Sequence, residues 1–187
     1  VNYAMNIVGG ARRDISKEQK ETLIKMIADL RKEYKNIYNI YTKDSSVAAR
    51  TKGVGLLTKD DALNYGACGP HGRASGVNFD VRRTMPYSCY QDFDFNVALC
   101  NEGDVFARAV VRLIEIEESC KIIEQALRNM PDGPINLGNK IPKVPKGEAL
   151  AVTEAPRGEV TYYVVSNGGP TNGRVNIHVP TFKNAMT

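Results

Sequence analysis

Two long stretches of the chain carry apolar side chains at the three- and four-residue spacing of an amphipathic helix, and they limit the fold more than any other feature. The first follows Ser16, which forms a helix-capping pattern with Gln19. Its apolar positions are Leu23, Ile27, Leu30, Tyr34, Ile37 and Tyr41. The second follows the capping residue Asp104, and its apolar positions are Phe106, Val110, Leu113, Ile116, Cys120, Ile123 and Leu127. The sequence therefore predicts two long helices that pack in a helical bundle.

The helical spacing also places charged residues on the opposite side of the second helix, where we expect them to face solvent. These residues are Glu115, Glu117, Glu118 and Lys121. Between the long helices, capping residues predict two shorter helices, at about residues 44–53 and 58–66. Residues 1–131 should therefore form a mainly helical part.

Glycine and proline interrupt the helical pattern in two places. Residues 66–90 show little periodicity, and we expect a loop there that is rich in glycine and arginine. Residues 132–147 are rich in proline and glycine. They should run as an extended connection from the helical part to a small β part, residues 148–187.

The β part contains two strand patterns separated by turn-forming residues. Residues 160–165 are mostly β-branched or aromatic, and residues 175–179 alternate between apolar and polar side chains. The turn formers at 167–173 predict an antiparallel hairpin between them. Together with the two long helices, this pattern predicts an α+β fold with a small antiparallel hairpin or sheet at the C-terminal end.

Charge and hydropathy exclude two classes of partner. The formal net charge is +4, from 25 basic and 21 acidic residues without a long run of one sign, which does not favour binding to nucleic acid. No apolar stretch approaches the roughly 18 to 20 residues that a membrane-spanning helix needs. We therefore expect no direct membrane span, and any membrane attachment must come through a partner.

The cysteines do not form a metal-ligand pattern. They are Cys68, Cys89, Cys100 and Cys120, and no two of them are two residues apart. Paired thiolates at such short spacing are the usual way in which one loop supplies two ligands to a soft metal. We therefore expect no metal ligand in this chain.

One arginine lies in a conformationally special position. Arg157 follows a proline, which has a fixed φ, and precedes Gly158, which is flexible. The predicted hairpin would bring residues 155–158 and 179–181 to the same edge of the sheet. A simpler alternative is that Arg157 pairs with Glu154 or Glu159 at the end of a strand.

The chain resembles a known family over nearly its whole length, from Gly9 to Asn184. The resemblance rests on Ala-Pro-Arg-Gly at 155–158, Val-Pro-Thr at 179–181, Gly-Arg-Ala-Ser-Gly-Val-Asn-Phe-Asp-Val-Arg at 72–82, and Pro-Tyr at 86–87. These motifs resemble the large, catalytic subunit of membrane-bound, energy-converting nickel-iron hydrogenases. That subunit is homologous to the 49 kDa, or D, subunit of complex I.

The resemblance implies roles for the residues around the arginine motif. Arg157 would lie beside a nickel-iron centre. We favour a role as a standing cation, because deprotonating a guanidinium at neutral pH would cost on the order of 8 kcal/mol, and a role as a base is the second hypothesis. Glu159 would be a step in a proton relay, or else a solvated residue or the partner of Arg157. The residues that would line the pocket around the iron's cyanide ligands are Ala155, Pro156, Val179, Pro180 and Thr181.

The resemblance also implies partners and a location. Arg73, Asp80, Arg82 and Arg83 would form ion-pair scaffolding, at a contact with the iron-sulfur small subunit. The complex would further contain membrane subunits, and the chain would lie on the cytoplasmic side of the cell membrane, attached only through these partners. Iron-sulfur clusters would belong to the partner subunit.

The hydrogenase family binds its metals through two pairs of Cys-x-x-Cys, and this chain has neither pair. We therefore expect it to be the central fragment of a longer subunit, with no cofactor of its own, inactive when isolated and able to self-associate. Two alternatives remain open. In the first alternative, the chain is part of the 49 kDa-type subunit of a complex I-like NADH or quinone oxidoreductase. In the second, it is a metal-free scaffold subunit.

Overall fold

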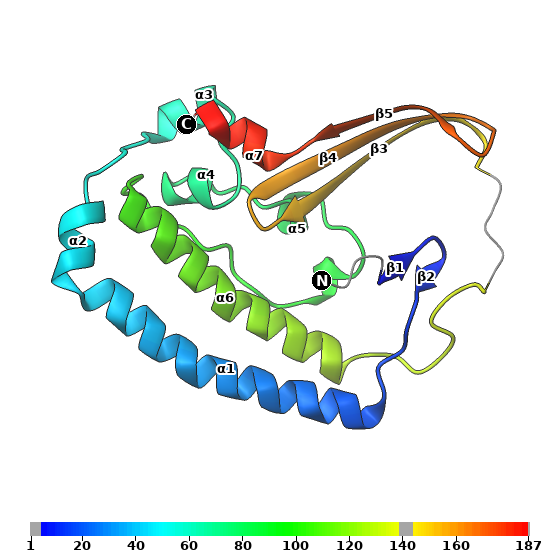
Figure 1. The fold of residues 1–187 in the computed structure, drawn as a ribbon, viewed down its shortest axis with the longest axis horizontal. Helices are drawn as coiled ribbons and strands as arrows, with labels where there is room; N and C mark the ends of the chain where they lie inside the picture. The colour runs from blue at the N-terminus through cyan, green and yellow to red at the C-terminus, as the bar shows by residue number, and fades with distance from the viewer. Residues whose placement is uncertain (1–4, 139–143, 187) are drawn as a thin grey trace.

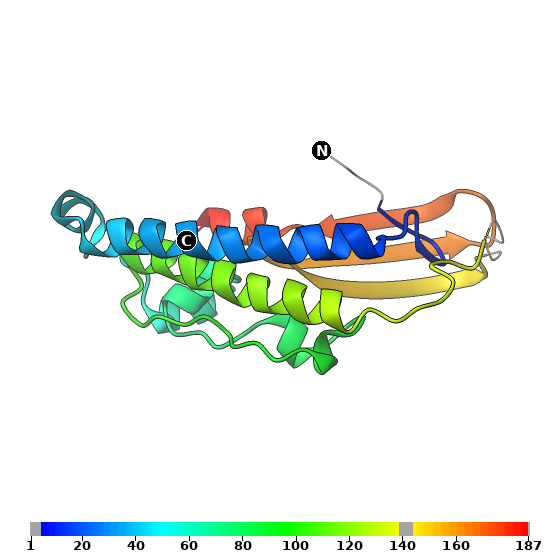
Figure 2. The same ribbon diagram turned by 90° about the horizontal axis from the view of Figure 1, so that it is seen from below.

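A computed structural model describes residues 5–138 and 144–186 of the chain, and it has the predicted α+β architecture. Two long helices, α1 (Lys17–Lys43) and α6 (Val105–Arg128), run antiparallel side by side (Figure 1). A three-stranded antiparallel sheet meets the helical part at one end and extends away from it. The view from below shows that these elements form a flat molecule (Figure 2). None of the described helices is long and apolar enough to span a lipid bilayer.

The predicted caps begin both long helices. The Ser16 hydroxyl accepts a hydrogen bond from the backbone N–H of Gln19 (3.2 Å), and the Gln19 side chain accepts one from the backbone N–H of Ser16 (2.9 Å). The Asp104 carboxylate accepts from the N–H of Ala107 (2.7 Å) and from the N–H of Gly53 (2.8 Å). Asp104 therefore begins α6 and also attaches the preceding part of the chain to it.

Shorter helices occupy the chain between the long ones. Two of them lie where their caps predicted them, but the segment 66–90, predicted to be a loop, contains two more. Asp80 caps the second of these, and neither is long enough to show a helical period in the sequence. The short helices are α2 (Ser45–Thr51), α3 (Lys59–Asn64), α4 (Pro70–Ala74), α5 (Val81–Thr84) and the 3₁₀ turn η1 (Tyr90–Asp92).

The sheet has the strand order β3 (Lys146–Ala155), β4 (Gly158–Asn167), β5 (Asn172–His178). The predicted hairpin is β4–β5, whereas β3 was not predicted. Alanine, lysine and glutamate are poor strand formers, and the first six residues of β3 are exposed, so the segment has no clear strand signal. It becomes a strand because β4 supplies a complementary edge along ten paired residues.

Two small elements complete the fold. A short ribbon, β1 (Asn6–Ile7) and β2 (Gly10–Ala11), lies near the start of the described chain. After β5, the chain forms α7 (Pro180–Lys183) and the 3₁₀ turn η2 (Asn184–Met186). Figure 1 shows α7 just beyond the end of β5, beside the start of β4.

The core forms where α4 packs against α6. Its buried members are Ala74, Ala98, Ala107 and Val111, all of them small or β-branched. Small side chains let the two helix backbones approach closely. By contrast α1 has no buried residue, and Ile37 in its apolar stripe is 55% exposed, so the bundle covers that stripe only in part.

The prediction that the acidic residues of α6 face solvent is wrong for two of them. Glu118 is buried, and its carboxylate accepts from the backbone N–H of Asn96 (2.8 Å) and pairs with Lys121 (2.6 Å). Glu115 pairs with Arg73 on α4. The inner side of α6 can carry acidic residues because the backbone N–H of Asn96 and the guanidinium of Arg73 donate hydrogen bonds to them.

Candidate functional site

Arg157 lies at the tip of the β3–β4 hairpin. Ala155 pairs with Gly158, so that Pro156 and Arg157 form a two-residue turn. The tip rests on the loop just before α4. A Cβ atom on Gly69 would lie 2.3 Å from the carbonyl oxygen of Arg157, and one on Gly158, whose φ is +123°, would lie 2.6 Å from the backbone nitrogen of Gly69. Two glycines therefore let the two backbones touch.

The side chain of Asn184 connects the same two backbones. Its Nδ2 donates to the carbonyl oxygen of Arg157 (3.1 Å) and to that of Cys68 (3.2 Å). Its Oδ1 accepts from the backbone N–H of Cys68 (3.0 Å). Residues 68, 157 and 184 are far apart in the sequence and meet at this point. The backbone of the arginine motif is thus attached to the helical part.

A buried guanidinium lies behind the tip. Arg73 on α4 is 2% exposed. It donates to Glu154 on β3 (2.9 Å) and, through two nitrogens, to Glu115 on α6 (2.7 and 3.0 Å). A further bond reaches the carbonyl oxygen of Phe79 (3.0 Å). One side chain therefore connects two helices and the sheet through charge-assisted hydrogen bonds.

A second ion pair adjoins the first. The buried carboxylate of Asp80 accepts from Arg82 (2.7 and 3.0 Å) and lies 3.6 Å from a nitrogen of Arg73. Burial alone would raise the pKa of Asp80, but the two guanidiniums outweigh it and keep that pKa below its ordinary value. Asp80 is therefore ionised in the folded chain at neutral pH.

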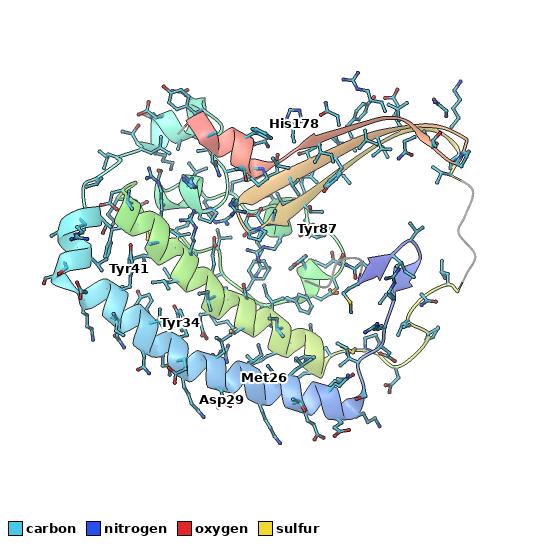
Figure 3. All side chains as sticks on the ribbon, viewed as in Figure 1. Met26, Asp29, Tyr34, Tyr41, Tyr87 and His178 are labelled. Atoms are coloured by element: carbon cyan, nitrogen blue, oxygen red, sulfur yellow. The ribbon has the colours of Figure 1, made fainter. Side chains whose placement is uncertain are left out.

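Glu154 responds differently to the same surroundings. Its second carboxylate oxygen accepts from the backbone N–H of Val81 (3.2 Å), and its own N–H donates to the Tyr87 hydroxyl (3.2 Å). Figure 3 places Tyr87 beside α5, near the end of β3. Burial raises the pKa of Glu154, and the cation of Arg73 offsets this rise only in part.

The two acidic residues near Arg157, Glu154 and Glu159, each form an ion pair with another cation. Glu154 pairs with Arg73, and the Glu159 carboxylate pairs with Lys183 of α7. Arg157 itself is exposed and has no ion pair among the described residues. The alternative in which Arg157 pairs with Glu154 or Glu159 is therefore not the arrangement in the structure. Glu159 is half-buried and also accepts from the Thr161 hydroxyl (3.3 Å).

The five residues predicted to line one pocket are distributed over the end of the sheet. Ala155 and Pro156 line a cavity of about 520 Å³, together with Arg73 and residues of α6. Val179 lines a different cavity, of about 390 Å³, beside His178, which Figure 3 labels at the end of β5. Pro180 is buried at the start of α7, and Thr181 is exposed. The two motifs lie at the same end of the sheet but line separate cavities.

The four residues predicted as scaffolding also differ in access. Arg73 and Asp80 are buried, and Arg73 also lines the cavity of about 520 Å³. Arg83 is exposed; it donates to the carbonyl oxygen of Phe95, and its guanidinium stacks on the Phe95 ring (3.8 Å). Arg82 is partly buried, and its guanidinium forms an ion pair with Asp80.

The described residues do not supply a ligand set for a nickel-iron centre. No group of three or more histidine, cysteine or acidic side chains lies close enough to hold a metal within residues 5–138 and 144–186. All four cysteines lie in these ranges and are free thiols. Burial raises the pKa of the Cys68 thiol above its ordinary value.

Sequence reasoning missed Glu115, Gly69 and Asn184 as parts of this site. Glu115 continues the line of buried positions that starts at Ala107 and Val111, four residues apart, and this spacing was an available signal. Gly69 and Asn184 had no such signal, because their partners are distant in the sequence.

Comparisons with known proteins agree on one family. A sequence profile described as "Respiratory-chain NADH dehydrogenase, 49 Kd subunit" matches residues 1–141 and 137–187. The chain is 40% identical over 185 residues to the carbon monoxide-induced hydrogenase of Rhodospirillum rubrum, covering 98% of this chain and 51% of that protein. It is 38% identical over 187 residues to the D-type subunit of the NADH-quinone oxidoreductase of Syntrophobacter fumaroxidans, covering 98% and 50%.

A solved structure is also similar. It is that of the membrane-bound sulfane sulfur reductase, an archaeal respiratory membrane complex, and the matched chain has a TM-score of 0.88 at 37% identity. The match covers 95% of this chain and 50% of the other. This chain therefore spans about half the length of the relatives that it matches.

Replacing Arg73 by methionine should lower the free energy of unfolding by about 3 to 5 kcal/mol, because it leaves the buried carboxylates without their cation. Arg50→Met is the matched control, since Arg50 is exposed on α2 and makes no ion pair with any described residue; it should change stability by less than about 1 kcal/mol. Urea denaturation measures both. Equal effects of the two variants would contradict the central role of Arg73.

The two carboxylates should give pH dependences of opposite sign. The pKa of Asp80 is lowered on folding from 3.8, so its ionised form stabilises the fold above that pH. The advantage of the wild type over Asp80→Asn should shrink as pH falls below 3.8. The pKa of Glu154 is raised from 4.5, so the wild type should lose stability relative to Glu154→Gln as pH rises above 4.5. Urea denaturation between pH 3 and 7 measures both trends; parallel trends would contradict the assignment.

Proposed function

The chain belongs to the family of the 49 kDa subunit of respiratory-chain NADH dehydrogenase, and from this premise we propose that it is part of the large subunit of a membrane-associated nickel-iron hydrogenase. The complex would reduce protons or oxidise hydrogen, coupled to iron-sulfur electron transfer and to ion translocation. The relatives named above are parts of oxidoreductases, which supports the broader class. The isolated chain would be inactive.

The observation that carries the proposal is an unpaired cation on a fixed backbone. Arg157 has no ion pair among the described residues, although acids stand three residues before it and two after it, and its carbonyl oxygen is bound by Asn184. A guanidinium held in this way can donate hydrogen bonds to anionic ligands and stabilise negative charge as it develops. Glu159 would serve as a proton-relay step beside it.

The metal chemistry itself would have to come from outside these residues. Because the described side chains do not form a ligand set for a nickel-iron centre, the ligand cysteines would lie elsewhere in the subunit. Iron-sulfur clusters would belong to a small partner subunit. That subunit and membrane subunits would attach the chain to the cytoplasmic side of the membrane.

Apolar side chains on the described surface support the need for such partners. On α1, Met26, Leu30, Ile37 and Ile40 recur at helical spacing and are 60%, 47%, 55% and 67% exposed. A contiguous apolar stripe of this kind favours association. The isolated chain would therefore self-associate in the absence of its partners.

Replacing Arg157 in the complete complex tests the cation role. Arg157→Met should lower hydrogen turnover by roughly 10²- to 10³-fold, the usual effect of removing a positioned donor, and Arg157→Lys should lower it less because the charge remains. Arg174→Met, at an exposed arginine on β5, is the control and should keep turnover. Wild-type turnover in Arg157→Met would contradict the role.

Nickel content separates the hydrogenase from the alternatives. The purified complete complex should contain stoichiometric nickel by elemental analysis, with Cys-x-x-Cys pairs in the rest of the subunit. Quinone reduction without nickel would instead support the 49 kDa-type subunit of a complex I-like oxidoreductase, which the 38% identical relative favours equally well. A complex with neither activity nor nickel would support the metal-free scaffold.

A further inference from the structure

The Asn184 side chain makes hydrogen bonds that join the arginine turn, residues 156–157, to the loop before α4. An amide both donates and accepts, and here it does both: it donates to the carbonyls of Arg157 and Cys68 and accepts from the N–H of Cys68. Aspartate at this position would keep the acceptor but lose both donors. Alanine would lose all three bonds.

The second motif of the chain brings Asn184 to this place. β5 ends at His178, beside the start of β4, and Pro180 begins α7 with a φ that suits the first turn of a helix. The short helix carries the chain onward from β5 toward the helical part (Figure 1), where Asn184 meets the loop before α4. Residues 179–181 thus affect the arginine turn indirectly, because they place Asn184, which follows α7 and binds the carbonyl of Arg157.

The backbone fixes the point from which the Arg157 side chain starts. No ion pair with a described residue holds its guanidinium, so the position of its Cα atom and the peptide plane that Asn184 binds restrain where the guanidinium can reach. The glycine contact fixes how near the turn approaches, since Gly69 and Gly158 leave no room for a Cβ atom. The contact does not fix the orientation of the carbonyl, which needs a directional bond.

We propose that Asn184 is a positioning residue for Arg157, and that it acts by holding the carbonyl of Arg157 against the Cys68 backbone. This inference rests on the proposed function, in which Arg157 is the working cation. A displacement of about 1 Å at a positioned group is enough to lower catalysis by about 10²-fold. Loss of the amide should therefore reduce turnover without removing any charged group.

The test uses Asn184→Ala and Asn184→Asp in the complete complex. Both should lower kcat by 10- to 100-fold and leave KM for the electron donor unchanged. Asn184→Asp keeps the acceptor for Cys68, so it provides a folded variant if the alanine variant does not assemble. The matched control is Asn136→Ala. It removes a hydrogen bond from the Asn136 amide to the carbonyl oxygen of Ala11 on β2 (2.9 Å) and should keep kcat.

Two readouts separate positioning from a merely structural role. Combined with Arg157→Met, either Asn184 variant should lower turnover no further, because both changes remove the same effect. Hydrogen exchange measured by mass spectrometry should become faster in the peptide that contains Cys68 and Gly69. The inference would be overturned if the losses of turnover from the two single variants multiplied in the double variant. It would also be overturned if hydrogen exchange in the peptide with Cys68 and Gly69 did not change.

The outcomes also distinguish this inference from the proposed function. Wild-type turnover in Arg157→Met would overturn the proposed role of Arg157, and the positioning role with it, even if exchange at Cys68 still became faster. Reduced turnover in Arg157→Met with wild-type turnover in both Asn184 variants would overturn the positioning role alone.

Discussion

The buried guanidinium of Arg73 is the interaction on which the rest of the structure depends. Its partners come from α6, from β3 and from the chain just before α5. A buried cation is tolerated only when carboxylates and carbonyls surround it, and arginine can satisfy several of them at once because it has five N–H donors. β3 meets α5 near the tip of the β3–β4 hairpin, where Glu154 binds Arg73 and the N–H of Val81, so this network helps to set the direction in which the sheet leaves the helices.

The same network explains why Arg157 stays unpaired. Glu154 and Glu159 face each other across the β3–β4 pair, where two carboxylates would repel. Each is instead paired with a cation from another element, Arg73 for one and Lys183 for the other. Because both acids are occupied, neither neutralises the arginine between them. Structural ion pairs thus leave Arg157 without an ion pair to any residue that the structure describes.

Local signals in the sequence were reliable where the chemistry was local. The cap of α1 needs only residues three apart, and the β4–β5 hairpin needs only alternation and a turn. The strand β3 and the helix α4 escaped detection because the first forms on an edge provided by β4 and the second is shorter than two turns. Glu115 was misassigned to solvent for a related reason. Its partner is 42 residues away, and periodicity cannot identify a buried charge without its counterion.

By itself, the sequence determined the two long helices, their caps, the β4–β5 hairpin and the family to which the chain belongs, because these depend on spacing and on contiguous motifs. The tertiary structure alone decided which charges pair. It assigned Glu154 to Arg73, left Arg157 exposed, and brought Asn184 to the arginine turn across 27 residues of chain. The physical reason is that a charge or an amide is satisfied by a partner that folding brings within about 3 Å, and for Glu154, Glu159 and Asn184 that partner is distant in the sequence.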